Sequence, residues 1–245
     1  MRVLVTAGAT EVPIDSVRAI TNIFKGRTGT EIAMQFAEEG WRRYTNEREP
    51  DVFVTLLTSN PDRVARMLEE ADGGNRKRLG PRLSVVPYCT FFELAVLMER
   101  EITNGAYDLI VHSAAVSDYS VRAIHVQDTA GQLTPLAPMA SGKVASGHDR
   151  LFLELERTPK LVEQIKKGFL WGFTGKLVQF KLEVGITDDE LIARARASLA
   201  RSRGDLVVAN CLEWMYERAI LVGADGSVEE ITRADLPQAL VRRFT

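Results

Sequence analysis

The sequence predicts an α/β fold: a Rossmann-like, doubly wound and mostly parallel sheet. Apolar, β-branched runs alternate with helical patterns, as is typical of a parallel sheet with helices on both faces. The first run, RVLVTA at 2–7, ends in a small-residue turn, the usual start of a nucleotide-binding sheet. The 245 residues contain no evident repeat or linker, so we expect a single nucleotide-binding domain over residues 1–245.

The composition excludes several classes of function. Hydrophobic residues make up 45% and charged residues 26%, and the net charge of −2 gives no basic stripe for nucleic acid. No apolar run approaches the roughly 20 residues that span a membrane. Cys89 and Cys211 follow no metal or redox spacing and fit a reducing compartment, so we expect a cytoplasmic protein.

Each element has its own signal in the chain. The predicted strands cover 2–7, 51–58, 82–88, 107–115, 177–184, 205–211 and 219–224. The predicted helices lie near 28–40, 61–72, 90–104, 159–168, 187–203 and 234–243. Prolines that follow Asn60 and Thr158 mark two helix starts, and TDDE at 187–190 predicts a capping box.

Residues 116–155 break the alternation, because they hold no helical pattern before the alternating strand RLFLELE. So long a loop is uncommon unless it is functional, disordered or part of an interface. It follows the fourth strand, at the sheet edge where ligands bind in such folds. We therefore expect a long irregular flap at 116–155 that forms active-site and dimer contacts, with disorder over part of 127–141 as the alternative.

Three glycines, Gly8, Gly26 and Gly29, stand at or near turns between strands and helices. Backbone N–H groups and the helix dipole attract phosphate at such turns, and glycine lets an anion approach the main chain. A glycine that only packs a strand against a helix gives the same pattern. The spacing matches neither a P-loop nor GxGxxG.

A polar stretch delays the first helix and includes Arg18 and Asn22. If the stretch is helical, these two side chains share one face. A guanidinium suits a bidentate phosphate or carboxylate contact, and a neutral amide suits a carbonyl or acyl-phosphate oxygen. The competing interpretation is a local cap with a surface ion pair between Arg18 and Asp15.

Further candidates follow later strands. In HSAAVSDYS at 112–120, small residues let a ligand lie against the backbone, and Asp118 can accept hydrogen bonds from a sugar or hold a metal. Lys143, flanked by small residues, suits charge stabilisation on a phosphoryl group. Phe180 can stack on a base, and Asn210 can bond a polar substrate. The alternatives are a turn aspartate, a loop lysine, a core aromatic and a turn asparagine, with His112 a core residue.

Together and in this order, the motifs resemble phosphopantothenate–cysteine ligase, or phosphopantothenoylcysteine synthetase, in its stand-alone bacterial form. The resemblance covers nearly the whole chain and rests on VTAGATEVPIDSVRAITN, AAVSDY, GKVASGHDRLFLELERTPKLV, FKLEVGITDDELIARARASL and DLVVAN. It implies a ligase of coenzyme A biosynthesis that joins 4′-phosphopantothenate and L-cysteine. CTP or ATP, with Mg²⁺ on its phosphates, would form an acyl nucleotidylate, and the cysteine amine would then displace the nucleoside monophosphate.

The resemblance also implies a homodimer and roles for single residues. Asn22, at the acyl group, and Lys143, at the activated phosphate, would be catalytic. The implied nucleotide-binding residues are Gly8, Gly26, Gly29, Ala114, Ala115, Asp118 and Phe180. Arg18 and Asn210 would bind substrate, and no side chain is assigned as a direct metal ligand.

The sequence departs from the family pattern inside the expected site. Ile23, Phe24 and Lys25 replace a basic residue and two hydroxyl residues, Gln179 replaces a glycine, and Cys211 replaces an aspartate. A catalytically silent or substrate-altered nucleotide-binding dimer therefore stays open. So does an NAD(P)-dependent reductase, which the VTAGAT turn favours and the missing third glycine and Tyr-x-x-x-Lys pair disfavour.

Overall fold

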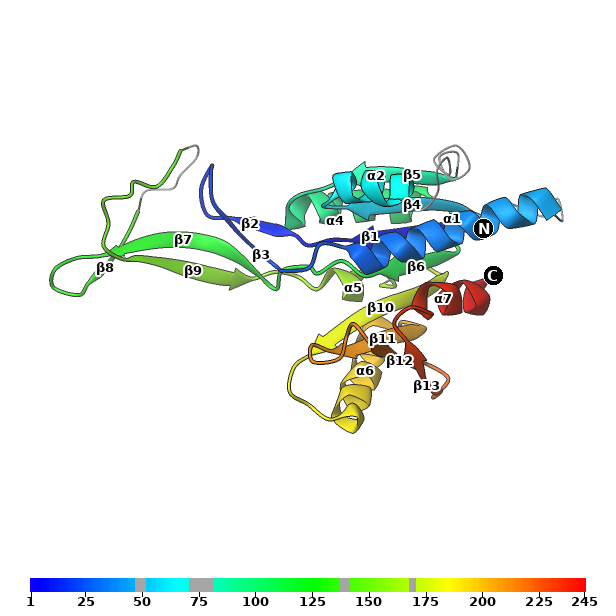
Figure 1. The fold of residues 1–245 in the computed structure, drawn as a ribbon. Helices are drawn as coiled ribbons and strands as arrows, with labels where there is room; N and C mark the ends of the chain where they lie inside the picture. The colour runs from blue at the N-terminus through cyan, green and yellow to red at the C-terminus, as the bar shows by residue number, and fades with distance from the viewer. Residues whose placement is uncertain (47–51, 71–81, 137–141, 168–170) are drawn as a thin grey trace.

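The computed structural model describes residues 1–46, 52–70, 82–136, 142–167 and 171–245, and an eight-stranded sheet lies at its centre (Figure 1). Six strands are parallel, in the spatial order β5 (Leu83–Pro87), β4 (Phe53–Thr58), β1 (Arg2–Ala7), β6 (Leu109–His112), β10 (Lys176–Glu183) and β11 (Leu206–Cys211). Antiparallel strands β12 (Arg218–Gly223) and β13 (Val228–Thr232) extend one edge. The predicted doubly wound, mostly parallel sheet is confirmed.

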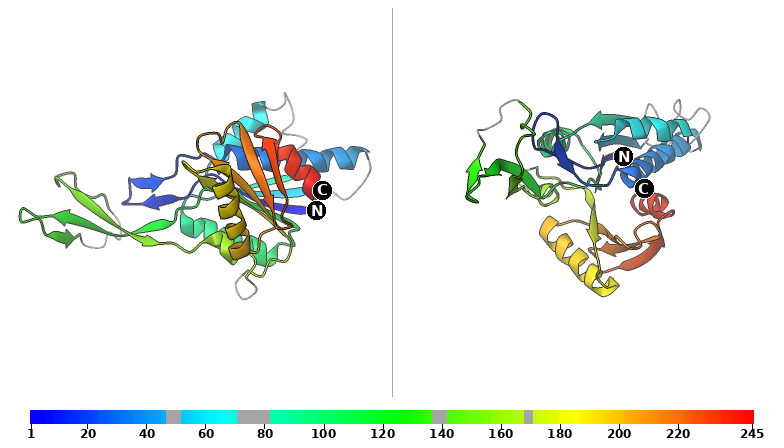
Figure 2. Two further views of the ribbon diagram at one scale, coloured as in Figure 1. Left: turned by 90° about the horizontal axis from the view of Figure 1, so that it is seen from below. Right: turned by 60° about the vertical axis from the view of Figure 1, so that its left-hand side comes forward.

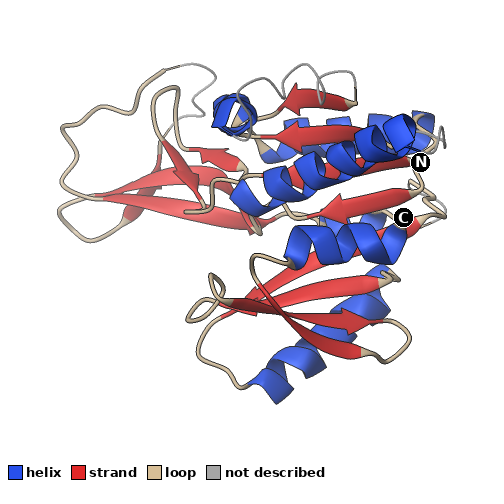
Figure 3. Cartoon of the chain, turned by 45° about the vertical axis from the view of Figure 1, so that its right-hand side comes forward, coloured by secondary structure: helices blue, strands red, loops and turns tan. Residues whose placement is uncertain are grey.

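Helices cover both faces of this sheet (Figure 3). On one face, α1 (Arg27–Asn46), α2 (Pro61–Glu70) and α7 (Leu236–Phe244) pack over an apolar cluster that includes Val5, Phe36 and Leu240. On the other face lie α4 (Phe91–Asn104), α5 (Leu161–Gln164) and α6 (Asp188–Ser202). Because both faces are covered, β6 and β11 are buried along their whole length, which explains their continuous apolar runs.

The helix boundaries follow local chemistry. The predicted capping box at 187–190 is present, because Thr187 accepts from the Glu190 backbone and the Glu190 side chain accepts from the Thr187 backbone. The first helix was predicted near 28–40, but α1 continues past Gly40 to Asn46. A Cβ added at Gly40 would lie 2.7 Å from the Val52 carbonyl oxygen, so close packing explains this glycine. The helix predicted at 159–168 is only α5 within the described residues.

The predicted flap contains more regular structure than the sequence indicates. Strands β7 (Tyr119–Gln127), β8 (Leu133–Pro135) and β9 (Leu151–Arg157) form an antiparallel sheet in the order β8-β7-β9. We call this sheet the arm, and it extends away from the body of the protein (Figures 1 and 2). A register shift between Val121 and Ala123 interrupts the alternation of β7, which is why the strand was missed. Residues 137–141, part of the stretch predicted as possible disorder, lie outside the described residues.

The polar stretch before the first helix is a hairpin, so its helical interpretation is wrong. Strand β2 (Glu11–Pro13) pairs with β3 (Ala19–Thr21). Asp15 Oδ1 accepts the backbone N–H groups of Val17 and Arg18, and this side-chain turn reverses the chain. Strand β2 also contacts β7, so the hairpin leaves the body beside the arm. Among the described helices, none has the length and apolar character needed to cross a bilayer.

Candidate functional site

The carboxyl ends of β1 and β6 form the centre of the candidate site. After β1, the chain adds β4 and β5 on one side of β1 within the sheet. It then returns to add β6 on the other side of β1. This reversal of strand order creates the crevice where such folds bind ligands. Gly8 follows β1, and Ala114 and Ala115 follow β6. The Ala115 N–H donates to the Gly8 carbonyl at 2.8 Å, and the Thr10 N–H donates to the Ala115 carbonyl at 3.3 Å. Both loops are thereby held together at one edge.

The predicted glycines bring the start of α1 to this edge. Gly8 and Gly26 have positive φ angles of 95° and 76°, which favour glycine. A Cβ added at Gly26 would lie 2.4 Å from the Gly8 nitrogen, so the two turns touch backbone to backbone. Gly29 lies in the first turn of α1, close to the Ser113 hydroxyl. The N–H groups of this turn have no acceptor within the helix, as an anion site requires.

Asn22 follows β3 and points at the same edge. Its Nδ2 donates to the Ala115 carbonyl oxygen at 3.0 Å. That acceptor fixes the orientation of the amide, and Asn22 Oδ1 has no partner among the described residues. The structure therefore brings Asn22 together with Gly8, Gly26 and the two alanines.

The buried side chains of Thr6 and His112 form hydrogen bonds beneath the loop that follows β6. Thr6 Oγ1 accepts the Ala114 N–H at 3.2 Å and lies 3.0 Å from His112 Nδ1. Because burial lowers the pKa of His112 to about 4, the imidazole is neutral at pH 7. With the Ala114 N–H donating to it, the Thr6 hydroxyl can donate to Nδ1. His112 is thus a core residue, as the simpler interpretation expected.

Arg18 and Lys143 lie apart from Asn22, at the tip of the β2–β3 hairpin. Arg18 Nε donates to Asp15 Oδ2 at 2.9 Å, and Arg18 Nη2 donates to the Val144 carbonyl at 3.0 Å. This is the ion pair of the competing interpretation, and the Arg18 hydrogen bond holds the pKa of Asp15 far below its ordinary value. The Val144 N–H donates to Asp15 in turn, at 3.1 Å. Lys143, the preceding residue, is exposed.

The geometry does not bring Lys143 to Asn22 of its own chain. Asn22 lies four positions after Arg18 along an extended strand, which places their Cα atoms up to about 13 Å apart at roughly 3.3 Å per residue. The neighbours of Lys143 bond to the far end of that strand: Gly142 to Ser16, and Val144 to Arg18 and Asp15. The backbone on either side of Lys143 is therefore bonded to the tip of the hairpin, whereas Asn22 follows its second strand.

Phe180 and Asn210 stand on adjacent strands, on the face covered by α1. Phe180 is half-buried and packs against the apolar cluster under α1 and α7. Asn210 is 4% exposed, and its Oδ1 accepts from Arg233 Nη1 at 3.0 Å. Arg233 also donates to the Thr28 hydroxyl in the first turn of α1. Arg233 was missed from the sequence, where TRADLP indicates only the start of a helix.

Asp118 lies at the base of the arm and is ion-paired. Its Oδ1 lies 2.5 Å from Lys160 Nζ. Beside it, Thr158 Oγ1 donates to the Ser117 carbonyl at 2.6 Å, so the two ends of the arm are joined where they leave the body. The carboxylate of Asp118 stays more than half exposed.

The departures from the family pattern fall in two places. Ile23 and Lys25 are exposed beside the crevice, with Phe24 half-buried between them. Gln179 and Cys211 are 2% and 1% exposed and face the layer of α6, away from α1. Within the described ranges, no three His, Cys, Asp or Glu side chains converge to hold a metal ion.

The chain is similar in sequence to known proteins over nearly its whole length. The family model for the DNA/pantothenate metabolism flavoprotein C-terminal domain matches residues 1–44. The coenzyme A biosynthesis bifunctional protein CoaBC of Thermococcus kodakarensis is 32% identical over 98% of this chain and 49% of its own length. The phosphopantothenate–cysteine ligase of Mus musculus is 25% identical over 93% of this chain and 77% of its own.

A solved structure supports the fold over the full length. The DNA/pantothenate metabolism flavoprotein from Streptococcus pneumoniae superposes with a TM-score of 0.73 at 25% identity, covering 99% of this chain and 97% of that one. The chain spans about half the length of the archaeal CoaBC relatives that it matches, at 49% and 41%. These likenesses confirm the resemblance that the sequence motifs indicate.

Proposed function

We propose that this chain, which is of the phosphopantothenate–cysteine ligase type, joins 4′-phosphopantothenate to L-cysteine through an acyl nucleotidylate. The observation that carries the proposal is the meeting of Asn22, Gly8 and the start of α1 at one edge of the sheet. This edge offers an amide for an acyl group beside N–H groups for phosphates. The names of the relatives supply the substrates.

The proposed reaction has two steps. A carboxylate oxygen of phosphopantothenate attacks the α-phosphorus of CTP or ATP, and pyrophosphate leaves. The cysteine amine then attacks the acyl carbon, loses a proton, and displaces the nucleoside monophosphate. Most of the catalysis is positioning and charge stabilisation, because the nucleotide supplies the leaving group.

The residues at the crevice have distinct parts in this scheme. The backbone around Gly8 and Gly26 and the first turn of α1 bind the phosphates. Asn22, held by Ala115, presents its amide to the acyl group. Mg²⁺ would supply positive charge on the phosphates. Cys89 and Cys211 are free thiols, which fits a reaction in the cytoplasm.

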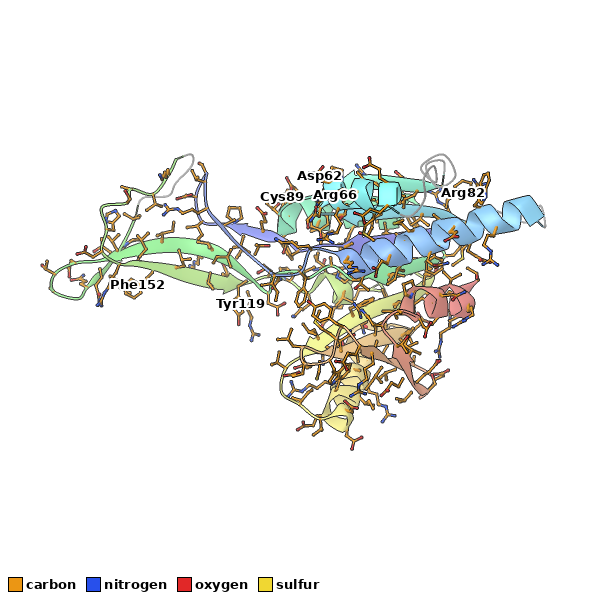
Figure 4. All side chains as sticks on the ribbon, in the orientation of Figure 1. Asp62, Arg66, Arg82, Cys89, Tyr119 and Phe152 are labelled. Atoms are coloured by element: carbon orange, nitrogen blue, oxygen red, sulfur yellow. The ribbon has the colours of Figure 1, made fainter. Side chains whose placement is uncertain are left out.

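We further propose that the arm mediates a homodimer. Two residues that lie directly opposite each other on β7 and β9 point to the same face of the arm, and successive pairs alternate between its two faces. One of these faces is mostly apolar. The apolar members of that face are Val121, Ile124, Val126, Leu151, Leu153 and Leu155. Leu155 is 46% exposed, and Tyr119 at the base of the same face is 44% exposed. Figure 4 places Tyr119 near the body, at the base of the arm. Ile124 is already buried at 7% exposed, and a second copy of the arm would bury the exposed members of this face.

The dimer also gives Lys143 a place in the reaction. In one chain the hairpin tip holds Lys143 away from Asn22. The tip and the arm leave the body on the same side (Figure 1). We therefore propose that Lys143 enters the crevice of the partner subunit and stabilises the activated phosphate there.

The experiment for the proposed function is a coupled pyrophosphate assay. The protein is incubated with Mg²⁺, phosphopantothenate, cysteine, and either CTP or ATP. We expect pyrophosphate release that depends on phosphopantothenate, with the faster nucleotide identifying the base preference. No release with either nucleotide, while one of them still raises the melting temperature, would favour the silent nucleotide-binding dimer instead.

A further inference from the structure

Arg233 connects the carboxyl-terminal part of the chain to the candidate site. It follows β13, and its backbone N–H donates to the Glu217 carbonyl at 2.8 Å. Its guanidinium reaches the first turn of α1, where it donates to the Thr28 hydroxyl. A second nitrogen donates to Asn210 Oδ1 at 3.0 Å. One cation thus joins α1, β11 and the loop before α7.

Both polar atoms of the Asn210 side chain are used in hydrogen bonds within the chain, one of them to Arg233. Its Oδ1 accepts from Arg233, and its Nδ2 donates to the Val208 carbonyl at 3.2 Å. With 4% of the residue exposed, little of the amide is available to a ligand. Asn210 therefore supports another group at this strand end.

The charge of Arg233 has no close counter-charge. Among the described residues, no carboxylate lies within ion-pair distance of it, and burial lowers its pKa. Glu31 attracts it from further along α1 but is bonded to Arg27 at 2.8 Å. The first turn of α1 carries no acidic residue. A half-buried cation beside the positive end of a helix is unfavourable unless an anion joins them.

The guanidinium of Arg233 still has N–H groups with which it can donate hydrogen bonds to an anion. A guanidinium has five N–H donors, and the two bonds above engage one from each terminal nitrogen. Its partner Thr28 lies two residues after Gly26, whose backbone is where the phosphates are proposed to bind.

We propose that Arg233 is a nucleotide-binding residue that contacts a phosphate oxygen of the bound nucleoside triphosphate, with Asn210 and Thr28 as its positioning residues. This inference rests on the proposed function, because that function supplies the nucleotide.

Nucleotide binding without turnover tests the inference. Titration calorimetry with MgCTP and MgATP, together with the rise in melting temperature, is measured for wild type, Arg233→Gln and Arg233→Lys. We expect Arg233→Gln to weaken binding at least tenfold and Arg233→Lys to restore part of it. Arg242→Gln, an exposed arginine on α7, is the matched control and should bind like wild type.

A mutant cycle tests the supporting role of Asn210. If Asn210 acts through Arg233, Asn210→Ala combined with Arg233→Gln should weaken binding no further than Arg233→Gln alone. In turnover assays the KM for nucleotide should rise while the KM for phosphopantothenate stays unchanged. Additive losses, or a rise in both KM values, would contradict it.

Two outcomes separate this inference from the proposed function. If wild type binds neither nucleotide, the proposed function fails. If wild type binds but Arg233→Gln binds equally well, only the inference fails. Should Arg233→Gln not fold, as judged by circular dichroism, Thr28→Val removes one support with little change in shape. It should then weaken binding severalfold, and unchanged binding would overturn the inference.

Discussion

Asn22 and Ala115 are joined by a hydrogen bond of 3.0 Å from the side-chain amide to the backbone carbonyl. The bond ties the end of the β2–β3 hairpin to the loop after β6, although the two residues are far apart in sequence. It fixes the amide at the crevice before any ligand arrives, which is the preorganisation that catalysis by charge stabilisation requires.

Replacing Asn22 with Asp should abolish this arrangement while preserving side-chain shape. The new carboxylate would face the Ala115 carbonyl oxygen and repel it, and it would oppose the charge that develops on the acyl group. We expect kcat to fall on the order of 100-fold or more. Asn104→Asp, at the exposed end of α4, is the control and should keep wild-type kcat. A normal rate for Asn22→Asp would remove Asn22 from the mechanism.

Mixed dimers test whether Lys143 acts in the partner's crevice. Asn22→Ala and Lys143→Gln should each be inactive alone. Mixing them should restore about a quarter of wild-type activity, because about half of the dimers are mixed and each then has one intact site. If both residues of one site come from the same chain, every site in the mixture is defective and no activity returns.

A substitution on the arm tests whether the arm forms the dimer interface. Leu155→Asp, placed in both chains, should dissociate the dimer in analytical ultracentrifugation and abolish the rescue. Val228→Asp changes a residue of similar exposure on β13, 44% against 46%, and should leave both dimer and rescue intact. A stable Leu155→Asp dimer would show that the arm is not the interface.

Gly26→Ala should destabilise the turn that carries the phosphate site. Both its positive φ and the 2.4 Å approach to Gly8 oppose a side chain. We expect a loss of about 2 kcal/mol or more in the free energy of unfolding. Gly226→Ala is the matched control, since its φ is also positive, at 88°, but its Cβ meets open space. Urea unfolding should show the smaller loss for Gly226→Ala, and equal losses would contradict the close approach.

His112 should make stability depend on pH. Its pKa in the folded chain is about 4, below the ordinary value of about 6.5. Between these values the unfolded chain binds a proton that the folded chain does not. Stability is therefore fully present above about 6.5 and falls toward pH 4, by up to about 1.4 kcal/mol per pH unit.

Urea unfolding at stepped pH measures this slope. His112→Gln should flatten it between pH 6.5 and 4, because the buried imidazole is gone. Replacing the exposed His148 by glutamine should keep the wild-type slope. An unchanged slope in His112→Gln would mean that this imidazole does not bind the proton.

The sequence predicts the centre of the fold well because that information is local. Apolar β-branched runs predicted the strands that flank the crevice, with Gly8 and Ala115 at their ends, and capping signals predicted the starts of helices. The parallel order follows from short crossover connections. The glycine and alanine turns were therefore predictable without knowledge of long-range contacts.

Other features depend on contacts between distant segments, which periodicity does not encode. Arg233 meets Asn210 and Thr28 only because β13 returns the chain to α1. The register shift in β7 hid a strand of the arm. The hairpin β2–β3, whose tip is bonded to the neighbours of Lys143, also depends on such contacts.

The most direct test of the proposed reaction follows a labelled oxygen atom. The protein is incubated with cysteine, the preferred nucleotide and phosphopantothenate that carries a heavy oxygen isotope in its carboxylate. The masses of the products are then determined by mass spectrometry. An acyl nucleotidylate transfers one labelled oxygen to the nucleoside monophosphate. Finding the label in inorganic phosphate, with a nucleoside diphosphate as co-product, would contradict the account.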